Sequence, residues 1–392
     1  MTTFWLWVFW GTVAVLAYVH FGYRALLAML GWRPVRDVPE AELPTVTLII
    51  PAHNEEVVLE EKLENAVRID YPREKLEILV ASDGSSDRTI EIAERFEERD
   101  VRALAFGNRR GKTSVLNDAV SSATGEVLCF CDANVMFQPD ALKVLVGRLS
   151  DTKIGAASGE VRLASHESNF EHGESLYYVL ERHVQLAESR LGSLMGVDGG
   201  MYVMHKELFR PLPADTILDD FVVSMHVIGQ GRRVVYEPRA LATENGTPLA
   251  SQEYRRRVRV SAGAVQSLKR SDFPPLSRPI ELWQYVSHKL LRWLGPLWLL
   301  LLLVASAALW NASVFYRGVF IAQVVVYLVA LAATLSVRLR RTRIGGVCFY
   351  LVMSHFAMAV GLVKGIFNRQ KVTWAKADRH QTPEALKSAV IE

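Results

Sequence analysis

The sequence predicts an α/β domain held between hydrophobic segments of membrane-spanning length. Three observations support this: 50% of the residues are hydrophobic while 22% are charged, an apolar run opens the chain, and further apolar runs lie near its end. This composition is too apolar for a disordered chain and too charged for a membrane bundle alone. At 392 residues the chain exceeds a typical domain, so we expect a globular domain together with a membrane region.

Charge and cysteine content exclude two classes of protein. The chain has 45 basic and 42 acidic residues, a formal charge of +3, which gives no support to nucleic-acid binding. Cys129, Cys131 and Cys348 are too few for a disulfide framework, and no CxxC pair suggests zinc. We therefore expect no nucleic-acid partner, and a catalytic region in a reducing compartment.

The first apolar run has the features of a membrane anchor. Residues 4–23 contain no Asp, Glu, Lys or Arg, and about 20 apolar residues suffice to cross a bilayer core of roughly 30 Å. Arg24, Arg33 and Arg36 follow the run, whereas basic residues precede the apolar stretch of a secretory signal. We therefore expect an anchor and linker over residues 1–44, with the next domain in the cytoplasm.

The C-terminal region contains more segments of this kind. Three stretches lack Asp, Glu, Lys and Arg and are long enough to cross a bilayer: 293–316, 318–337 and 344–363. Basic residues flank the third stretch on both sides, so a re-entrant or interfacial arrangement, or a tail outside the cell, stays open. Residues 281–293 mix aromatic and charged side chains, as an interfacial helix does. We assign 276–367 to this interfacial helix and about three membrane segments, and 368–392 to a basic tail.

Residues 45–275 have the pattern of a globular α/β domain. Short β-branched runs predict strands at 45–51, 76–82, 101–106 and 126–132, with helices beginning near Glu55, Ser86 and Lys112. This alternation predicts a parallel sheet covered on both faces. Ligands of such sheets bind at the carboxyl ends of the strands.

Three of the predicted strands end in polar clusters: AHNEE at 52–56, SDGSSD at 82–87 and DAN at 132–134. Any one cluster is also typical of a helix N-cap or a turn. Three at the same edge of one sheet favour a binding site.

Six motifs in order carry a family resemblance: IIPAHNEE, ASDGSSDRT, NRRGKTSVLNDAV, CDANVMFQPDAL, LDDFVVSMHVIGQGRRVVYEP and YRRRVRVSAG. Together with the membrane segments they resemble the membrane-embedded family 2 glycosyltransferases. Among these the chain is similar to the synthases of poly-N-acetylglucosamine, hyaluronan, chitin oligosaccharides and cellulose. The resemblance implies a GT-A (Rossmann-like) nucleotide-sugar-binding domain with transmembrane helices on both sides, and it implies a uridine diphosphate sugar as donor.

The resemblance also assigns the donor site. It implies nucleotide-sugar binding by Ala52, Glu55, Asp83, Lys112, Asp132, Gly199, Arg256 and Arg259. Asp83 would accept a hydrogen bond from the uracil ring, with Glu55 beside the nucleoside. Lys112, at the head of a helix, would meet a phosphate, although a solvated lysine on a turn is the alternative.

A divalent cation follows from the same resemblance. Asp132 stands at the first position of the family's DxD motif and would hold the ribose or the cation, while Asn134 replaces the second aspartate. Oxygen ligands suit Mg²⁺ or Mn²⁺, and the change to an amide removes one negative charge from the site.

The resemblance also implies that Asp220 is the catalytic base and that Asp219 supports it, although two carboxylates at a helix start are also typical of dipole complementation. A sugar hydroxyl is a poor nucleophile, so a carboxylate must remove its proton. In-line attack then inverts the anomeric centre, and an α-linked donor gives a β-glycoside.

Residues 254–260 lie where polymerising members carry QxxRW. Arg256 replaces the glutamine, Arg259 keeps the arginine and Val260 replaces the tryptophan. Arginine can stabilise the leaving diphosphate, and a basic helix on anionic lipid is the alternative. The loss of tryptophan bears on processivity rather than on transfer.

The sequence as a whole predicts an inverting glycosyltransferase of the cell (inner) membrane with a cytoplasmic catalytic domain. It would extend a β-linked extracellular polysaccharide from a UDP-sugar, in contact with membrane lipids. Two alternatives stay open: single addition to a lipid acceptor, and a non-catalytic nucleotide-sugar sensor.

Overall fold

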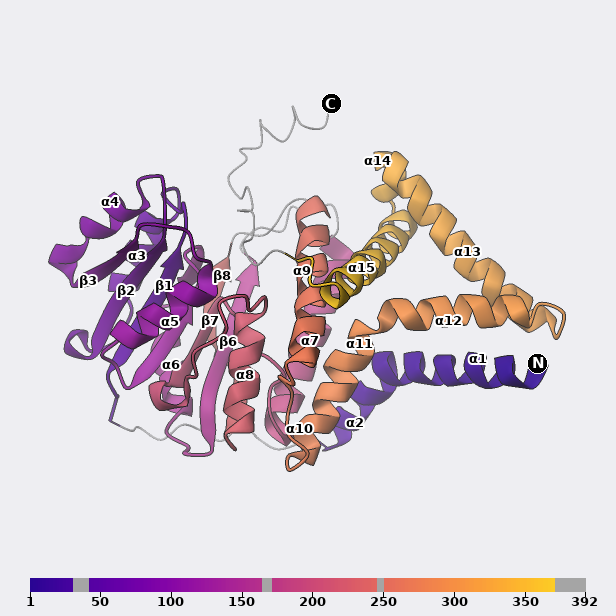
Figure 1. The fold of residues 1–392 in the computed structure, drawn as a ribbon, viewed down its shortest axis with the longest axis horizontal. Coiled ribbons are helices and arrows are strands. Elements are labelled where there is room, and N and C mark those ends of the chain that lie inside the picture. The colour runs from indigo at the N-terminus through magenta and orange to yellow at the C-terminus, as the bar shows by residue number, and fades with distance from the viewer. Residues whose placement is uncertain (31–41, 164–170, 245–249, 371–392) are drawn as a thin grey trace.

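The computed structural model describes residues 1–30, 42–163, 171–244 and 250–370. It shows a sheet domain beside an arm of long apolar helices, with a group of helices between them (Figure 1). Arg33, Arg36 and residues 371–392 of the predicted tail lie outside the described residues.

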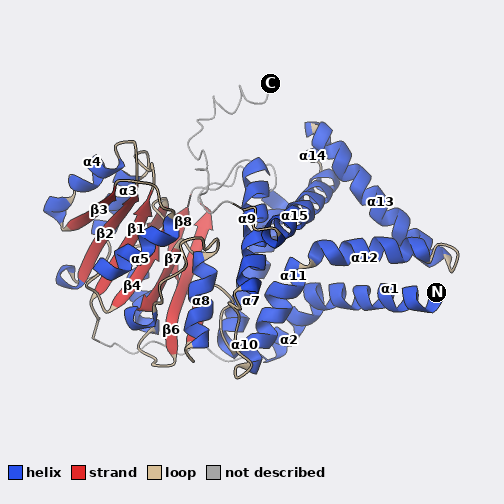
Figure 2. Cartoon of the chain, viewed as in Figure 1, coloured by secondary structure: helices blue, strands red, loops and turns tan. Residues whose placement is uncertain are grey.

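The domain is built on an eight-stranded sheet in the described residues, with the order β3-β2-β1-β4-β7-β6-β8-β5 (Figure 2). The strands are β1 (Val46–Ala52), β2 (Leu76–Asp83), β3 (Val101–Phe106), β4 (Val127–Cys131), β5 (Val135–Phe137), β6 (Ile154–Leu163), β7 (Met201–His205) and β8 (Arg233–Glu244). β1 pairs in parallel with β2 and β4, and β2 pairs in parallel with β3. The predicted parallel arrangement is therefore confirmed for the first four strands.

The other half of the sheet is mixed, which the prediction of a parallel sheet did not include. β7 runs antiparallel to both β4 and β6, and β5 runs antiparallel to β8, while β6 and β8 are parallel. Met201, the first residue of β7, lies opposite Cys131, the last residue of β4. The loop that precedes β7 is therefore brought to the same edge as the carboxyl end of β4.

Helices cover both faces of the sheet, as the sequence predicts. The helices α3 (Leu59–Val67), α4 (Thr89–Glu94) and α6 (Ala141–Arg148) contribute to one hydrophobic core, and α5 (Lys112–Ser122) and α8 (Asp219–Gly229) contribute to the other. The side chains of β1 alternate between the two: Leu48 and Ile50 belong to the first core and Ile49 to the second. A strand that is buried on both faces explains the continuous apolar run in its sequence.

A group of helices joins the sheet domain to the apolar arm (Figure 1). It comprises α7 (Glu171–Leu191), α9 (Ala250–Lys269), α10 (Pro279–Gln284), the π-helical segment η5 (Tyr285–Leu290) and α11 (Leu291–Trp293). Tyr285 and Trp293 pack with Phe221 of α8, with ring centroids 6.3 Å and 5.6 Å from the Phe221 ring. The segment predicted to be interfacial is thus helical and is fixed to the second hydrophobic core.

The arm contains α1 (Thr2–Ala17), η1 (Tyr18–Gly22) and α2 (Tyr23–Leu30) at one end of the chain, and α12 (Gly295–Ala308), α13 (Val314–Leu335), α14 (Val337–Arg340) and α15 (Arg343–Ile366) at the other. Within the described residues, three helices are long and apolar enough to cross a membrane: Thr2–Leu30, Val314–Leu335 and Arg343–Ile366. These match the predicted anchor and the last two predicted membrane segments.

The predicted segment 293–316 is not one helix. α12 has 14 residues and ends at Ala308, and Ser313 starts α13 by accepting a hydrogen bond from the Phe315 backbone. At about 1.5 Å per residue, α12 is roughly 21 Å long and does not cross a 30 Å core alone. It is bent by 61° relative to the helices of 279–293, and the two parts are long and apolar enough to cross a membrane only when they are taken together.

Helix α15 packs closely along α9 through small residues. A Cβ atom added to Gly361 would lie 2.4 Å from the carbonyl oxygen of Val258, and one added to Gly365 would lie 2.7 Å from Cβ of Val265. Lys269 of α9 donates hydrogen bonds to the carbonyl oxygens of Gly365 and Ile366. Small residues permit such backbone contact between helices, so α15 fixes the position of α9.

This packing predicts a stability effect. Gly361→Leu should lower the melting temperature of the detergent-purified protein, because the added side chain separates α15 from α9 at a cost of about 1–3 kcal/mol. Gly318→Leu on α13 is the matched control, since a Cβ at Gly318 meets no atom within 4 Å. Equal melting temperatures for the two variants would contradict the close packing.

Candidate active site

Acidic residues from separate segments converge at one edge of the sheet. Asp83 ends β2, Asp132 follows β4, and Asp219 and Asp220 begin α8. The glycine-rich loop, residues 196–200, precedes β7 and reaches the same edge because β7 runs antiparallel to β4. The topology thus places four carboxylates and the glycine-rich loop at the carboxyl end of the parallel strands, where ligands of such sheets bind.

Lys112 joins two of these carboxylates. Its Nζ donates to Oδ1 of Asp132 at 2.9 Å and lies 3.4 Å from Oδ2 of Asp219. Burial acts to lower the pKa of Lys112, but the carboxylates of Asp132, Asp219 and Asp220 outweigh it and raise this pKa well above its usual range. The lysine is therefore a permanent positive charge at the centre of the acidic group.

Asp83 fixes the loop that leads to Lys112. Its Oδ1 accepts a hydrogen bond from the backbone N–H of Arg110 at 2.6 Å, and its Oδ2 accepts one from Gly111 at 2.8 Å. Gly84 has a φ of +61°, and a Cβ there would lie 2.5 Å from the Arg109 nitrogen, so only glycine permits this contact. Each Asp83 oxygen keeps a further lone pair with which it can accept a bond from a ligand.

Asp220 has the environment of a base. Burial raises the pKa of Asp220 to about 6, and the like charge of Asp219 adds to this, while Lys112 and Arg259 oppose it. Its Oδ1 accepts a bond from the Phe221 backbone at 2.7 Å. A carboxylate with a pKa close to neutrality is a better proton acceptor than an ordinary aspartate.

The glycine-rich loop lies directly against Asp220. A Cβ on Gly199 would be 3.1 Å from Oδ2 of Asp220. Ser224 of α8 ties the two together, because its hydroxyl donates to the Asp220 carbonyl at 2.8 Å and accepts from the Val197 backbone at 3.0 Å. Gly199 therefore lies beside the Asp220 carboxylate, and its role in nucleotide-sugar binding stays a prediction.

Asp198, in the same loop, is a functional candidate that we did not single out from the sequence. Burial raises the pKa of Asp198 to about 6, and the charges of Glu244, Asp220 and Asp132 add to this rise. Its backbone N–H donates to Ser158 of β6 at 2.8 Å. The signal in the sequence was one acidic residue between glycines, a pattern that also describes an ordinary turn.

The side-chain oxygens of Asp132 and Asn134 suit a cation whose other ligands come from the substrate. Asn134 donates its amide N–H to Oε1 of Glu244 at 3.0 Å, which leaves its carbonyl oxygen as an acceptor. Within the described ranges, no group of three His, Cys, Asp or Glu side chains could hold a metal by itself. Mg²⁺ is commonly held by one or two protein oxygens together with substrate phosphates and water, and Asp132 with Asn134 fits this pattern.

The two predicted arginines have different surroundings. The charge of Arg259 acts on Asp220 and favours its ionised form. Arg256 forms an ion pair with Glu253 at 3.2 Å, and its side chain is 59% exposed. Both lie on α9, and the charge of Arg259 acts on the carboxylate of Asp220.

The remaining predicted residues lie at the end of β1 or just after it. Ala52 is buried and pairs with Ser82, next to Asp83. The backbone N–H of Glu55 donates to Thr89 Oγ1 at 2.8 Å, which ties this segment to the start of α4. Ala52 and Glu55 are therefore at the same edge of the sheet as Asp83.

Comparisons with known proteins agree with this geometry. The family described as "Glycosyl transferase family 2" matches residues 47–212. Over 163 residues the chain is 36% identical to a probable glycosyltransferase, YdaM, of Bacillus subtilis. This match covers 38% of this chain and 39% of that protein. Over 243 residues it is 26% identical to poly-β-1,6-N-acetyl-D-glucosamine synthase of Staphylococcus aureus, which covers 60% of this chain and 58% of the synthase.

A solved structure is similar over nearly the whole chain. It is a mannosyltransferase from Pyrobaculum calidifontis in complex with GDP-Man and Mn²⁺, with a TM-score of 0.70 and 25% identity, and the match covers 93% of this chain and 100% of that one. Residues 47–212 therefore form a glycosyltransferase family 2 domain, and the fold is GT-A. The chain spans less than two thirds of the length of the two relatives matched by sequence.

The raised pKa of Asp220 predicts an effect on stability. Its pKa rises from 3.8 to about 6 on folding, so the folded state binds the proton more tightly and this carboxyl lowers stability as the pH increases through that interval. Asp220→Asn should therefore raise the free energy of unfolding at pH 8 by roughly 1–3 kcal/mol, with little change near pH 4. Thermal unfolding at both pH values measures this, with exposed Asp140→Asn as control. A variant less stable than the wild type at pH 8 would contradict the assigned environment.

Proposed function

We propose that this protein is a membrane-associated, inverting glycosyltransferase that moves a sugar from a nucleoside diphosphate sugar to an acceptor hydroxyl. One observation carries the proposal: Lys112 gathers Asp132 and Asp219 beside Asp220, a carboxylate with a pKa of about 6. A base, a cation and a diphosphate-binding edge of a GT-A sheet are the groups that such a transfer needs.

The proposed reaction has one displacement step. Asp220 takes the proton of the acceptor hydroxyl, whose oxygen forms a bond to the anomeric carbon while the bond from that carbon to the diphosphate breaks. The nucleoside diphosphate leaves with the electron pair, and attack from the opposite face inverts the anomeric centre. Lys112 and Arg259 stabilise the charge on the leaving group.

Asp132 and Asn134 are the residues that would hold a divalent cation. When bound, the cation supplies further positive charge to the diphosphate of the donor. The mannosyltransferase that resembles this chain was solved with Mn²⁺, which supports Mn²⁺ or Mg²⁺ as the cofactor.

The nucleobase of the donor is a separate question. The sequence motif around Asp83 favours UDP, and the Staphylococcus aureus relative is a poly-β-1,6-N-acetyl-D-glucosamine synthase. The mannosyltransferase was solved with GDP-Man. We propose that the donor is a nucleoside diphosphate sugar, with a UDP-sugar as the first candidate and GDP-mannose as the second.

Two acceptors have support. The similarity to the poly-N-acetylglucosamine synthase supports a growing β-linked extracellular polysaccharide. The replacement of the family's tryptophan by Val260, and the break of the predicted segment 293–316 into α12 and α13, favour a single addition to a lipid acceptor. In both cases the acceptor is proposed to meet the catalytic domain on the cytoplasmic side of the membrane.

If Asp220 is the base, its substitution should cause a large loss of activity. Asp220→Asn should lower kcat about 10²- to 10⁴-fold with little change in the affinity for the nucleotide, because the variant loses proton removal and keeps the donor site. Initial rates of nucleoside diphosphate release in the presence of acceptor lipids test this, with Asp140→Asn as control. Unchanged turnover would remove Asp220 from the mechanism, and nucleotide binding without any turnover in the wild type would favour a sensor.

Donor and product are tested in one experiment. The purified full-length protein is offered UDP-glucose, UDP-N-acetylglucosamine and GDP-mannose with Mn²⁺, Mg²⁺ or excess chelator, in the presence of membrane lipids. We expect metal-dependent release of the diphosphate from one of these donors. A ladder of product lengths would establish polymerisation, and a single lipid-linked product would establish single addition.

A further inference from the structure

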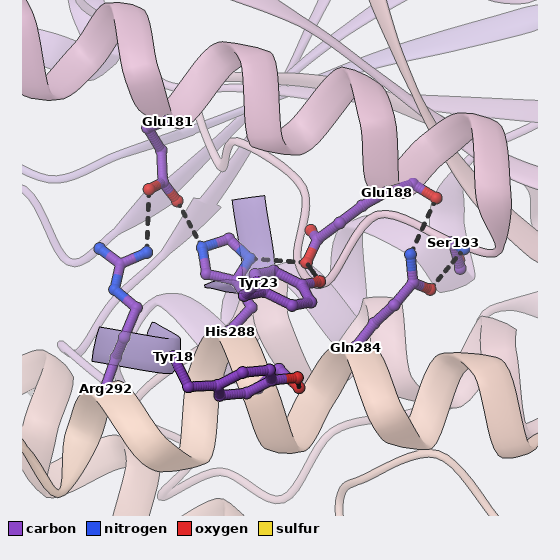
Figure 3. A network of polar contacts seen from close by, with 9 residues as sticks. Tyr18, Tyr23, Glu181, Glu188, Ser193, Gln284, His288 and Arg292 are labelled. Carbon is purple, nitrogen blue, oxygen red and sulfur yellow. Dashed lines mark hydrogen bonds and ion pairs between the residues drawn. The ribbon is translucent and has the colours of Figure 1, made fainter. Parts of the chain in front are cut away.

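A network of charged and polar side chains lies between α7 and the facing helices α10, η5 and α11 (Figure 3). His288 of η5 contacts Glu181 Oε1 through Nε2 at 2.9 Å and Glu188 Oε1 through Nδ1 at 2.8 Å. Arg292 donates to the other oxygen of Glu181 at 2.9 Å, and Tyr23 of α2 donates to Glu188. Ionised carboxylates only accept hydrogen bonds, so donors engage both oxygens of Glu181 and Oε1 of Glu188, whereas within the described residues the buried Oε2 of Glu188 has no hydrogen-bond partner.

Lys289, the next residue along η5, faces a different neighbour. Its Nζ would lie 3.9 Å from a Cβ built on Gly196, at the start of the glycine-rich loop, and Phe221 of α8 borders the same point at 3.5 Å. The other end of this loop, at Gly199, is beside Asp220. The charge of Asp220 is among those that act on Lys289. The lysine therefore belongs to the wall of the candidate active site.

The ammonium group of Lys289 is available for a ligand. Across the described residues, no hydrogen bond or ion pair within 4.0 Å engages it; the charges of Glu181 and Glu188 act on it from a greater distance, and both glutamates contact His288. Protein atoms surround the side chain, yet it keeps part of its surface accessible. A charge without a direct partner in such a place is unfavourable. An anion that pairs with it is therefore bound more strongly than it would be at an open surface.

The position of Lys289 points to the acceptor rather than to the donor. Lys112, the cation beside Asp132, comes from α5, whereas Lys289 comes from η5, which continues through α11 into apolar helix α12. In Figure 1, α8, which carries Asp220, lies between α5 and the α10–α11 segment. Inverting displacement places the acceptor and the leaving diphosphate on opposite faces of the transferred sugar. Lys289 is thus on the face that an acceptor from the membrane approaches.

We propose that Lys289 binds a phosphate group of the acceptor, and that the acceptor is a phosphate-bearing lipid whose hydroxyl reaches Asp220. This inference rests on the proposed transferase function and deepens it by naming the substrate class. The phosphate can come from a phospholipid headgroup that has a hydroxyl or from an isoprenoid-linked phosphate that carries a sugar hydroxyl, and the chemistry at Lys289 is the same for both.

The test uses full-length protein, labelled donor and total membrane lipid separated into acidic and neutral fractions by anion exchange. We expect the label in the acidic fraction. Lys289→Gln should raise the acceptor KM about tenfold or more, since it removes a charged hydrogen bond, and should raise the donor KM by much less. Lys289→Arg should restore most of the acceptor affinity. Phospholipase treatment or mild acid then distinguishes the phospholipid product from the isoprenoid product.

The control is Lys143→Gln on α6, whose side chain is largely away from the core and pairs with Asp70 at the surface. Label in neutral lipid or in a polymer free of phosphate would overturn the inference while leaving the transferase function intact. An acceptor KM unchanged in Lys289→Gln would overturn it as well. A wild-type protein without donor hydrolysis or transfer would instead contradict the transferase function itself.

Discussion

The ion pairs of Lys112 with Asp132 and Asp219 are the constraint on which the site depends. Carboxylates brought together repel one another and resist ionisation. One lysine between two of them offsets this repulsion, and Asp83 holds the loop that positions it through two backbone N–H groups. Asp220 remains outside these two ion pairs, which leaves its pKa raised by burial and available for proton transfer.

The scaffold brings these groups together from both halves of the domain. The parallel strands deliver Asp83 and Asp132, and antiparallel β7 returns the glycine-rich loop to the same edge. Helix α9 delivers Arg259, and α15 packs on α9 by backbone contact at Gly361. A helix apolar enough to cross a membrane therefore packs directly on the helix that carries Arg259, and this packing joins the sheet domain to the apolar helices.

Local pattern was sufficient for part of this structure. The first four strands were predicted to within about a residue, because β-branched runs end at turn-forming Gly, Asn and Asp residues, and the gathering of the acidic residues followed from the family resemblance with the rule for sheet edges. The antiparallel β7 and the position of Lys289 depend on contacts between distant segments, which no local pattern encodes. The break after α12 did have a local signal: Asn311 and Ser313 interrupt the apolar run, and Ser313 caps α13.

The most direct test of the account is the pH dependence of kcat/KM in the wild type and in Lys112→Met. If Lys112 holds down the pKa of Asp220, the wild-type rate should fall below about pH 6, and the variant's acidic limb should move to higher pH by about one unit or more, as loss of an adjacent positive charge requires. An acidic limb at the same pH in both proteins would contradict the claim that Lys112 organises the carboxylates around the base.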